Sequence, residues 1–476
     1  MADVAGIFKA YDVRGVVPEQ LDESVARATG AAFVEVLDVL AGPGAVVIGY
    51  DMRPSSPALA AAFAEGVAST GADVIDIGLA STDQLYFASG RLDLPGAMFT
   101  ASHNPAQYNG IKMCRAGAAP VGSDSGLRDI ADLVAKALTE SPAAGSATGH
   151  ITRKDLLTAY ADHLHDLVDL SGIRPLTVVV DAGNGMGGHT VPAVLGTGAG
   201  LPELPLEIVP LYFELDGTFP NHEANPLEPE NLRDLQAAVL EHGADLGLAF
   251  DGDADRCFVI DERGEAVSPS AITAMVATRE IAREGAAGTP AEQVSIVYNV
   301  ISSAAVPEII SEHGAHGVRT RVGHSFIKAE MADAGAVFGG EHSAHYYFRD
   351  FWFADTGMLA AMHVLAALGG QEKPLSELTS VFSRYAASGE INSTVTDATA
   401  ATEQVRQWAA ARGAGFDTLD GLTATHAGAD GDPMWWLNLR ASNTEPLLRL
   451  NVEAADRATM ERVRDDVLAL VRGEAR

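Results

Sequence analysis

The sequence predicts an α/β protein of several domains, and three observations support this fold class. Its 476 residues correspond to about three or four domains of ordinary size. Up to about residue 370, short apolar runs typical of buried strands alternate with longer helical patterns, as in proteins with parallel sheets. Beyond residue 371 a helical pattern is followed by two closely spaced strand patterns, which predicts a final domain of mixed α+β type.

The first expected domain covers residues 1–147. It opens on a turn in which Lys9, Tyr11 and Arg14 stand close together. The predicted elements that follow are a helix with apolar positions from Val25 to Leu40, a buried strand at 45–49, an alanine-rich helix at 57–70 and a strand at 72–77. The small, polar stretch 141–149 predicts a linker to the next domain.

The second expected domain, residues 148–262, contains a glycine-rich turn with two interpretations. A helix is predicted at 156–170 and a strand at 176–180, and residues 183–188 then match G-x-G-x-x-G. This pattern binds dinucleotides where it opens the first strand–helix unit of a domain, but here a predicted helix precedes the strand. A structural turn is therefore favoured, and nicotinamide chemistry is kept as the rival function.

Two more domains are expected at residues 263–371 and 372–476. The third continues the alternation of helices and strands. Its apolar segment 357–370 contains His363 and is too short to span a bilayer, so a buried helix is predicted. The fourth has a predicted helix at 402–412 and predicted strands at 434–439 and 447–452.

Composition and charge exclude several classes of function. The formal net charge of −32 argues against binding to nucleic acid or to an anionic membrane. The only cysteines, Cys114 and Cys257, provide no disulfide framework, and no basic region followed by an apolar stretch stands at the N-terminus. The expectation is a cytoplasmic protein in which an anionic substrate would have to be met by local positive charge.

The stretch 99–105, Phe-Thr-Ala-Ser-His-Asn-Pro, places a hydroxyl at the end of a predicted strand. Asn-Pro at 104–105 and Asn-Gly at 109–110 mark two turns just before Lys112. Ser102 is therefore expected on a loop where it can meet a substrate. Because a serine hydroxyl is a weak nucleophile without help from a base, a cation or a metal, the stretch taken alone also fits an ordinary polar turn.

Asp251, Asp253 and Asp255 alternate between two predicted strands, so the backbone can direct all three carboxylates to one point. Oxygen-only ligands suit Mg²⁺ or a similar hard cation. A calcium loop fits less well, because Arg256 stands where such a loop needs glycine and because strands rather than helices flank it. The alternative is a solvated acidic turn. In a metal site, the reacting group would supply a fourth oxygen.

Two neighbouring stretches carry candidate binding residues. Glu341 suits paired sugar hydroxyls and His345 can exchange a proton near neutral pH, whereas His342 is expected to be a packed side chain. Gly323 and His324 stand at a predicted strand-to-helix boundary that would expose backbone amides.

The stretch Arg440 to Pro446 is rich in hydrogen-bond donors. It offers a guanidinium, two hydroxyls, an amide and loop N–H groups after an apolar strand. Such a set fits capture of a dianionic phosphate better than it fits a plain turn before proline.

Four segments together resemble the signature loops of the α-D-phosphohexomutase family, in that family's order and approximate spacing. They are residues 100–105, 251–256, 340–345 and 440–446. The resemblance covers the whole chain. It implies three related α/β domains with mixed sheets and a smaller C-terminal α+β domain around a central cleft, which one loop from each domain would line.

The resemblance also implies residue roles. Ser102 would be carried as phosphoserine, and its phosphate would complete a Mg²⁺ site formed by Asp251, Asp253 and Asp255. A hexose 1,6-bisphosphate would form, reorient and return its other phosphate to Ser102. The residues implied in catalysis are Ser102, His103, Lys112, Arg14, Arg256 and His345, with Lys112 or His345 exchanging a proton with the sugar. Those implied in substrate binding are Tyr11, Gly323, His324, Glu341, Ser343, Arg440, Ser442, Asn443 and Thr444.

The segment 340–348 is most similar to the phosphomannomutase/phosphoglucomutase branch. This implies a hexose phosphate substrate and a monomer or weak homodimer. Mannose and glucose differ only at C2, so a main activity on glucose phosphates stays open. The alternatives of other classes are a metal-dependent sugar-phosphate phosphatase, a nicotinamide oxidoreductase and a non-catalytic sugar-phosphate binder.

Overall fold

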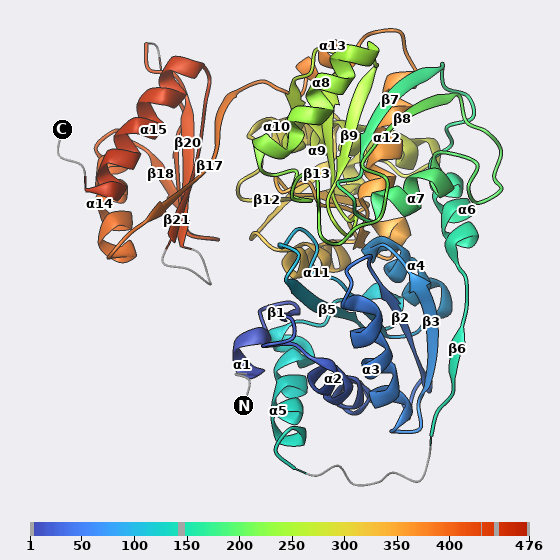
Figure 1. Ribbon diagram of the computed structural model, residues 1–476. Coiled ribbons are helices and arrows are strands. Elements are labelled where there is room, and N and C mark those ends of the chain that lie inside the picture. Colours follow the sequence, from blue (N-terminus) through green and yellow to red (C-terminus); the bar gives the residue numbers. More distant parts are fainter. Residues whose placement is uncertain (1–3, 141–147, 430, 442–446, 474–476) are drawn as a thin grey trace. The chain divides into compact units, whose positions relative to one another are not determined.

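The computed structural model describes residues 4–140, 148–429, 431–441 and 447–473 (Figure 1). The chain divides into two compact units. One consists of residues 1–267 with 343–378, and the other of residues 268–342 with 379–476. Each unit is described by itself below.

The first sheet of unit 1 has the strand order β1-β5-β4-β2-β3-β6 and is mixed. β2 pairs in parallel with β3 and β4, and β3 with β6, whereas β5 runs antiparallel to β4 and β1. The strands are β1 (Val13–Val16), β2 (Ala45–Tyr50), β3 (Asp73–Leu79), β4 (Gly96–Phe99), β5 (Tyr108–Cys114) and β6 (Ile151–Arg153). The helices are α1 (Val4–Ile7), α2 (Glu23–Val36), α3 (Ser56–Ala68), α4 (Thr82–Leu92) and α5 (Arg128–Ala137).

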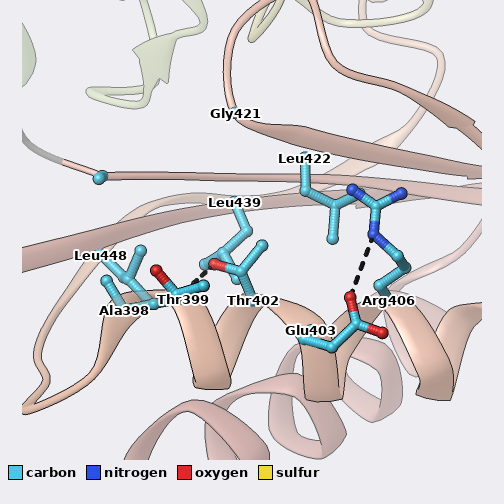
Figure 2. A pocket seen from close by; sticks show the side chains of 10 residues that line it. Ala398, Thr399, Thr402, Glu403, Arg406, Gly421, Leu422, Leu439 and Leu448 are labelled. Atoms are coloured by element: carbon cyan, nitrogen blue, oxygen red, sulfur yellow. Dashed lines mark hydrogen bonds and ion pairs between the residues drawn. The ribbon is translucent and has the colours of Figure 1, made fainter.

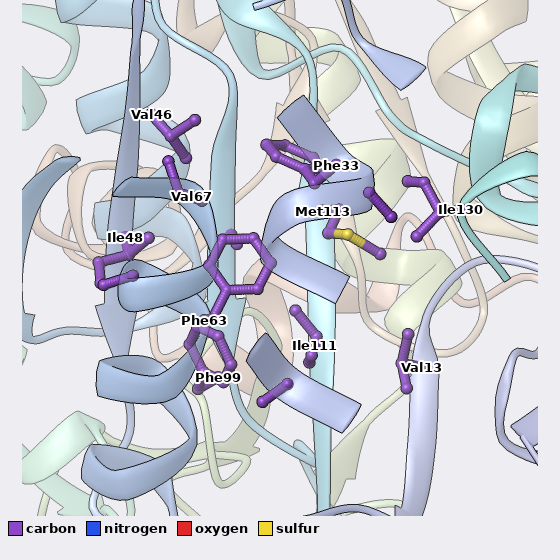
Figure 3. Close-up of a cluster of buried hydrophobic side chains, with 14 of the residues drawn as sticks. Val13, Phe33, Val46, Ile48, Phe63, Val67, Phe99, Ile111, Met113 and Ile130 are labelled. Atoms are coloured by element: carbon purple, nitrogen blue, oxygen red, sulfur yellow. The ribbon is translucent and has the colours of Figure 1, made fainter. Parts of the chain in front are cut away.

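Aliphatic side chains and three phenylalanines form the core between this sheet and helices α2 and α3 (Figure 3). The ring of Phe63 lies 5.7 Å from that of Phe33 and 5.4 Å from that of Phe99, in tilted and edge-on contacts that aromatic pairs favour. The two helices approach closely because Gly30 faces the Phe63 carbonyl, where an added Cβ would lie only 2.2 Å from the oxygen. This core supports β4, the strand that leads into the Ser102 loop.

The second sheet of unit 1 has the order β11-β10-β9-β7-β8. β7 pairs in parallel with β8 and β9, and β10 runs antiparallel to β9 and β11. Phe250 pairs with Cys257 at the end of β9 and β10, so residues 251–256 form the connection between these strands. The elements are α6 (Leu157–Leu167), β7 (Leu176–Asp181), α7 (Gly187–Val194), β8 (Leu206–Leu211), α8 (Arg233–His242), β9 (Leu246–Phe250), β10 (Cys257–Asp261) and β11 (Ala266–Val267).

Unit 1 also contains a later stretch of the chain. β15 (Tyr346–Phe348) and β16 (Ala354–Asp355) pair antiparallel, and α12 (Gly357–Gly369) follows them. α12 is buried along nearly all of its length, which confirms the predicted buried helix. Within the described residues no helix is long and apolar enough to cross a membrane.

In unit 2, β12 pairs in parallel with β13 and β14. The C-terminal sheet has the order β17-β21-β20-β19-β18 and is antiparallel throughout, with Val405 of α14 and Val463 of α15 buried against Trp435 and its neighbours. The helices are α9 (Pro269–Ala286), α10 (Ala305–Glu312), α11 (His324–Ala334), α14 (Ala398–Ala410) and α15 (Arg457–Arg472), with α13 (Leu375–Ser380) at the junction. The strands are β12 (Ser295–Asn299), β13 (His316–Thr320), β14 (Phe338–Gly340), β17 (Ala386–Thr394), β18 (Gly415–Asp417), β19 (Leu422–His426), β20 (Trp435–Ala441) and β21 (Leu447–Ala454).

The predicted fold class, α/β domains with mixed sheets followed by a smaller α+β domain, is confirmed. The helix predicted from Val25 to Leu40 is shorter at its C-terminal end in the structure. α2 stops at Val36, because Asp38 adopts a φ of 53°, and Leu40 is exposed. Most of the linker proposed at 141–149 lies outside the described residues, and the boundaries after 147, 262 and 371 stay predictions.

A buried carboxyl group ties three helices of unit 1 together. Asp83, in the first turn of α4, accepts hydrogen bonds from the hydroxyls of Tyr160 on α6 and Thr356, the N-cap of α12, both at 2.7 Å. Ser81, the N-cap of α4, also donates to it. Burial raises the pKa of Asp83 to about 6, and the nearby negative charge of Asp255 adds to this, whereas the three hydroxyl donors oppose it.

Replacing Asp83 by Asn is expected to change how stability depends on pH. Because the folded-state pKa lies above its ordinary value of 3.8, the folded protein holds a proton that the unfolded chain has lost. The stabilisation is present at low pH and is lost as the pH rises through about 6, which amounts to about 1.4 kcal/mol between pH 5.0 and 7.5. The unfolding temperature measured by calorimetry should therefore decrease more between pH 5.0 and 7.5 in the wild type than in Asp83→Asn.

The matched control is Tyr160→Phe, which removes one donor but keeps the carboxyl group. Its stability should still fall as the pH rises, with the transition at a higher pH than in the wild type, because the Tyr160 hydroxyl lowers the pKa of Asp83. If Asp83→Asn and the wild type gave parallel midpoints over this pH range, Asp83 would not be the titrating group.

Candidate active site

Ser102 lies on a tight loop directly after β4 and is almost fully buried. Its backbone adopts a φ of 49°, a left-handed conformation that residues with side chains rarely occupy. Its amide donates to the hydroxyl of Thr100 at 2.9 Å. Backbone strain of this kind persists only where the surroundings hold the conformation.

Arg53 provides that support. Its guanidinium, buried and 3.3 Å from the carboxylate of Asp51, donates four hydrogen bonds to backbone carbonyls of the loop. The acceptors are Ser102 at 2.9 Å, Asn104 at 2.6 Å, Pro105 at 2.9 Å and Tyr108 at 2.9 Å. Sequence reasoning did not identify Arg53, although a charged pair directly after the buried strand β2 was an available signal.

The loop 251–256 meets the Ser102 loop from a position 149 residues away in the chain. The Ser102 hydroxyl donates to Asp251 Oδ2 at 2.9 Å. Gly252 makes this approach possible, because a Cβ there would lie 2.3 Å from the Ser102 carbonyl oxygen. The predicted convergence of these two loops is therefore present in the structure.

The three predicted metal ligands form one buried cluster. One carboxylate oxygen from each of Asp251, Asp253 and Asp255 lies within 4.8 Å of the others. Lys112 Nζ donates at 2.6 Å to Oδ2 of both Asp253 and Asp255. The Oδ1 atoms of these two residues are buried and make no hydrogen bond with the described residues. Oxygen-only donors with buried, uncommitted lone pairs fit a hard divalent cation.

The protonation of the cluster reflects its crowding. Burial raises the pKa of Asp251, and the carboxylates of Asp255 and Asp253 add to this against the opposing charge of Arg256. Burial also acts on Asp253, but Lys112 holds the pKa of that carboxyl well below its usual range. A bound cation would favour the ionised form of all three groups.

Arg256 and His103 contact each other beside the Ser102 hydroxyl. Arg256 Nε donates to Asp251 Oδ2 at 2.8 Å, and Arg256 Nη2 donates to His103 Nδ1 at 2.6 Å. His103 Nδ1 is also 3.1 Å from Ser102 Oγ. Burial, together with the charges of Arg256 and Arg14, lowers the pKa of His103 well below its usual value, so the imidazole is neutral.

Arg14 lies on β1 and reaches the same loop. Its guanidinium donates to the Ala101 carbonyl at 3.0 Å and to the side chain of Asn104, and it pairs with Asp12. Tyr11 is half-buried just before β1. Arg14 therefore lies against the Ser102 loop, and its role in catalysis stays a prediction.

His345 lies next to the acidic cluster. Its backbone forms an isolated bridge with Arg256, and its Nε2 is 3.7 Å from Asp255 Oδ1. Ser343 Oγ lies 3.0 Å from His345 Nδ1, and the imidazole remains partly exposed. Apart from Tyr11, the predicted residues of unit 1 therefore lie together. They are Arg14, Ser102, His103, Lys112, Asp251, Asp253, Asp255, Arg256, Ser343 and His345.

The other predicted binding residues belong to unit 2. Glu341 is buried and accepts from the Gly323 amide at 3.1 Å and from Asn299 Nδ2 at 3.3 Å. Gly323 precedes α11 with a φ of 131°, and His324 begins that helix, as the predicted strand-to-helix boundary required. Arg440 Nη2 donates to Glu390 at 2.8 Å. Ser442, Asn443 and Thr444 lie outside the described residues.

The glycines of 183–188 serve close backbone packing. A Cβ at Gly185 would lie 2.7 Å from the Gly252 carbonyl oxygen, and one at Gly188 would lie 2.2 Å from the Phe213 carbonyl oxygen. The Met186 amide also donates to the Gly252 carbonyl at 2.9 Å. Protein backbone thus fills the space that a dinucleotide would need here, which supports the structural turn.

Figure 2 shows a separate pocket of about 490 Å³ in the C-terminal domain, between α14 and the strands β19 to β21. Its polar side chains include Glu403 and Arg406, which pair at 3.6 Å. The described members of the predicted site do not line it.

Four family models match successive parts of the chain. Their descriptions are phosphoglucomutase/phosphomannomutase alpha/beta/alpha domains I, II and III and the C-terminal domain of the same family, at residues 5–140, 158–264, 269–385 and 390–470.

Individual proteins are similar over the same length. The "Phosphohexose mutases" of Xanthomonas campestris pv. campestris are 40% identical over 98% of this chain and 99% of their own length. The phosphomannomutase of Salmonella montevideo is 39% identical over 98% of both chains. A crystal structure of a phosphoglucomutase/phosphomannomutase family protein from Burkholderia thailandensis superposes with a TM-score of 0.86 and 30% identity, covering 100% of this chain and 99% of that one.

Replacing Arg53 by Lys is expected to loosen the Ser102 loop. An ammonium carries its donors on one nitrogen, so it cannot reach four carbonyl oxygens spread over residues 102–108. Loss of a single charge-assisted hydrogen bond, worth about 1.5–3 kcal/mol, speeds amide exchange about tenfold or more. Hydrogen–deuterium exchange at Asn104 and Tyr108, whose amides donate within the loop, measures this effect.

Arg27→Lys is the matched control, because Arg27 makes an exposed ion pair with Glu65 on the surface of unit 1. It should leave exchange in the Ser102 loop unchanged. Equal exchange at Asn104 and Tyr108 in Arg53→Lys and the wild type would show that Arg53 does not support the loop.

Proposed function

We propose that this chain, which belongs to the phosphoglucomutase/phosphomannomutase family, interconverts mannose 1-phosphate and mannose 6-phosphate through a phosphorylated Ser102. The observation that carries the proposal is the 2.9 Å hydrogen bond between Ser102 Oγ and Asp251, which joins a serine hydroxyl to a carboxylate cluster that fits a metal. Phosphomannomutases 38–39% identical to this chain over nearly its whole length support mannose as the sugar.

Asp251, Asp253 and Asp255 are the proposed ligands of Mg²⁺. When bound, the ion neutralises negative charge on the phosphoryl group as it moves between Ser102 and the sugar. A phosphate oxygen of phosphorylated Ser102 is the proposed additional ligand, since the hydroxyl of the unphosphorylated residue already donates to Asp251.

Cationic side chains of the same site would neutralise the negative charge of the phosphoryl group that the metal leaves unbalanced. Arg256 and Lys112 each contact the carboxylate cluster, and Arg14 contacts the Ser102 loop. Phosphoryl transfer depends mainly on positioning and on neutralised charge, so these fixed donors provide what the reaction requires. His103, held neutral, accepts from Arg256 through Nδ1 and so holds the guanidinium near the Ser102 hydroxyl.

We assign proton exchange with the sugar hydroxyl to His345. Lys112 already donates to two carboxylates, whereas the His345 imidazole is partly exposed and stands beside Asp255. The contact between Ser343 Oγ and His345 Nδ1 at 3.0 Å orients the imidazole, as general acid–base catalysis requires.

The remaining contacts are proposed from family resemblance. Glu341 and Ser343 would bind sugar hydroxyls, and Tyr11, Gly323 and His324 would contribute to substrate binding. Arg440 with Ser442, Asn443 and Thr444 would hold the phosphate that is not reacting. A hexose 1,6-bisphosphate is the proposed intermediate, and its addition in trace amounts would restore phosphate to Ser102.

Parallel assays of mannose 1-phosphate and glucose 1-phosphate test the proposal. With Mg²⁺ and a trace of glucose 1,6-bisphosphate, the wild type should convert the mannose phosphate and, at a lower rate, the glucose phosphate. Ser102→Ala should lose at least about a thousandfold in rate, because it lacks the nucleophile. Chelation of the metal should stop turnover.

Three other outcomes of these assays would change the proposed function. Conversion of neither sugar phosphate under these conditions would overturn the proposal. Release of inorganic phosphate without dependence on the bisphosphate would indicate a phosphatase. Faster conversion of the glucose phosphate would make phosphoglucomutase the main activity.

A further inference from the structure

We propose that Thr82 is a positioning residue for the metal site, which it serves by fixing the orientation of the Asp253 carboxylate. The inference rests on the proposed function, because it takes Asp253 as a metal ligand. Thr82 is fully buried at the start of α4, and its hydroxyl donates to Asp253 Oδ2 at 2.5 Å. Its amide donates to the Asp253 carbonyl at 3.1 Å. These contacts join residues 171 positions apart in the sequence.

The two oxygens of Asp253 have different surroundings. Oδ2 accepts from both Thr82 and Lys112, whereas Oδ1 is buried and makes no hydrogen bond with the described residues. Rotation of the carboxylate would break both hydrogen bonds to Oδ2. The two donors therefore hold Oδ1 in place as the oxygen that can bind a cation, in the way that outer partners orient metal ligands.

Among the described residues, Thr82 is a neutral hydroxyl donor to the cluster, as Ser102 is. Arg256 and Lys112 would change the charge of the site if they were replaced, and Ser102 is the proposed nucleophile. Thr82 and Ser102 donate to different carboxylates, Asp253 and Asp251, so removal of the Thr82 hydroxyl should alter the orientation of one ligand without changing the charge of the site. This makes its effect separable from theirs.

Hydrogen bonds also fix the N-terminal end of α4, where Thr82 lies. Ser81 caps the helix by accepting from the Gln84 amide at 3.3 Å, and Asp83 is tied to Tyr160 and Thr356. A β-branched side chain in a helix has few rotamers, which limits the motion of the Thr82 hydroxyl. The helix amide of Thr82, which has no partner inside the helix, is satisfied by the metal loop. The Thr82 hydroxyl is thus a fixed donor to the loop 251–256, whose carboxylates must keep one geometry to bind a metal.

The test compares Mg²⁺ affinities of unphosphorylated proteins by calorimetric titration with the metal alone. Thr82→Val keeps the shape of the side chain but removes the donor, and we expect it to bind Mg²⁺ about 10- to 100-fold more weakly than the wild type. Thr82→Ser keeps the hydroxyl and should bind within about threefold of the wild type, a difference smaller than the tenfold that 1.4 kcal/mol represents.

Thr29→Val is the matched control. Thr29 is equally buried in α2 and donates to the Val25 carbonyl at 2.8 Å, far in the sequence from both loops. It should lose stability as Thr82→Val does but keep the Mg²⁺ affinity of the wild type. If Thr82→Val does not fold, Thr82→Ala removes the same hydroxyl with less bulk and replaces it in the comparison.

Wild-type Mg²⁺ affinity in a folded variant without the hydroxyl at position 82 would overturn the inference. Loss of affinity in Thr82→Ser equal to that in Thr82→Val would also overturn it, since the hydroxyl would then not be the cause. Failure of the proposed function would look different, because the wild type would then bind Mg²⁺ without any mutase turnover.

Discussion

The hydrogen bond between the Ser102 hydroxyl and the Asp251 carboxylate is the contact on which the rest of the site depends. It joins two loops that follow strands of different sheets, and it forms only because Gly252 lets the second loop reach the Ser102 carbonyl. Arg53 and Arg14 hold the first loop from one side, and the backbone of residues 185 and 186 supports Gly252 from the other. Rigid elements on both sides thus place one hydroxyl beside one carboxylate.

Charge balance explains why this contact suits phosphoryl transfer. Three buried carboxylates face two cationic side chains, Lys112 and Arg256, which leaves the cluster short of positive charge. A divalent cation would reverse the sign of the site, and a dianionic phosphate would then be attracted to it. This local arrangement matters in a chain whose formal net charge is −32, because the field of the whole protein repels anions.

Much of the fold and of the site could be predicted from local sequence patterns. Short apolar runs ending in polar clusters placed Ser102 and the three aspartates at strand ends, where the structure has them. Arg53 and Thr82 were missed because their partners lie 49 and 171 residues away, and the charged pair after β2 marks Arg53 without showing which loop it contacts. The end of α2 was missed for a different reason. The apolar period continues past Val36, while the left-handed backbone at Asp38 ends the helix.

The most direct test of a shared site for the hydroxyl and the metal is a pulsed electron paramagnetic resonance measurement on Mn²⁺ bound to protein phosphorylated at Ser102. If the hydroxyl and the metal share one site, the spectrum should show a resolved magnetic coupling between Mn²⁺ and the phosphorus of that residue, which disappears in the unphosphorylated protein. Two controls establish that the phosphate is on Ser102: the intact mass of the wild type shows one phosphate, and that of Ser102→Ala shows no phosphate. If Mn²⁺ binds to this phosphorylated protein without such coupling, the shared site is contradicted.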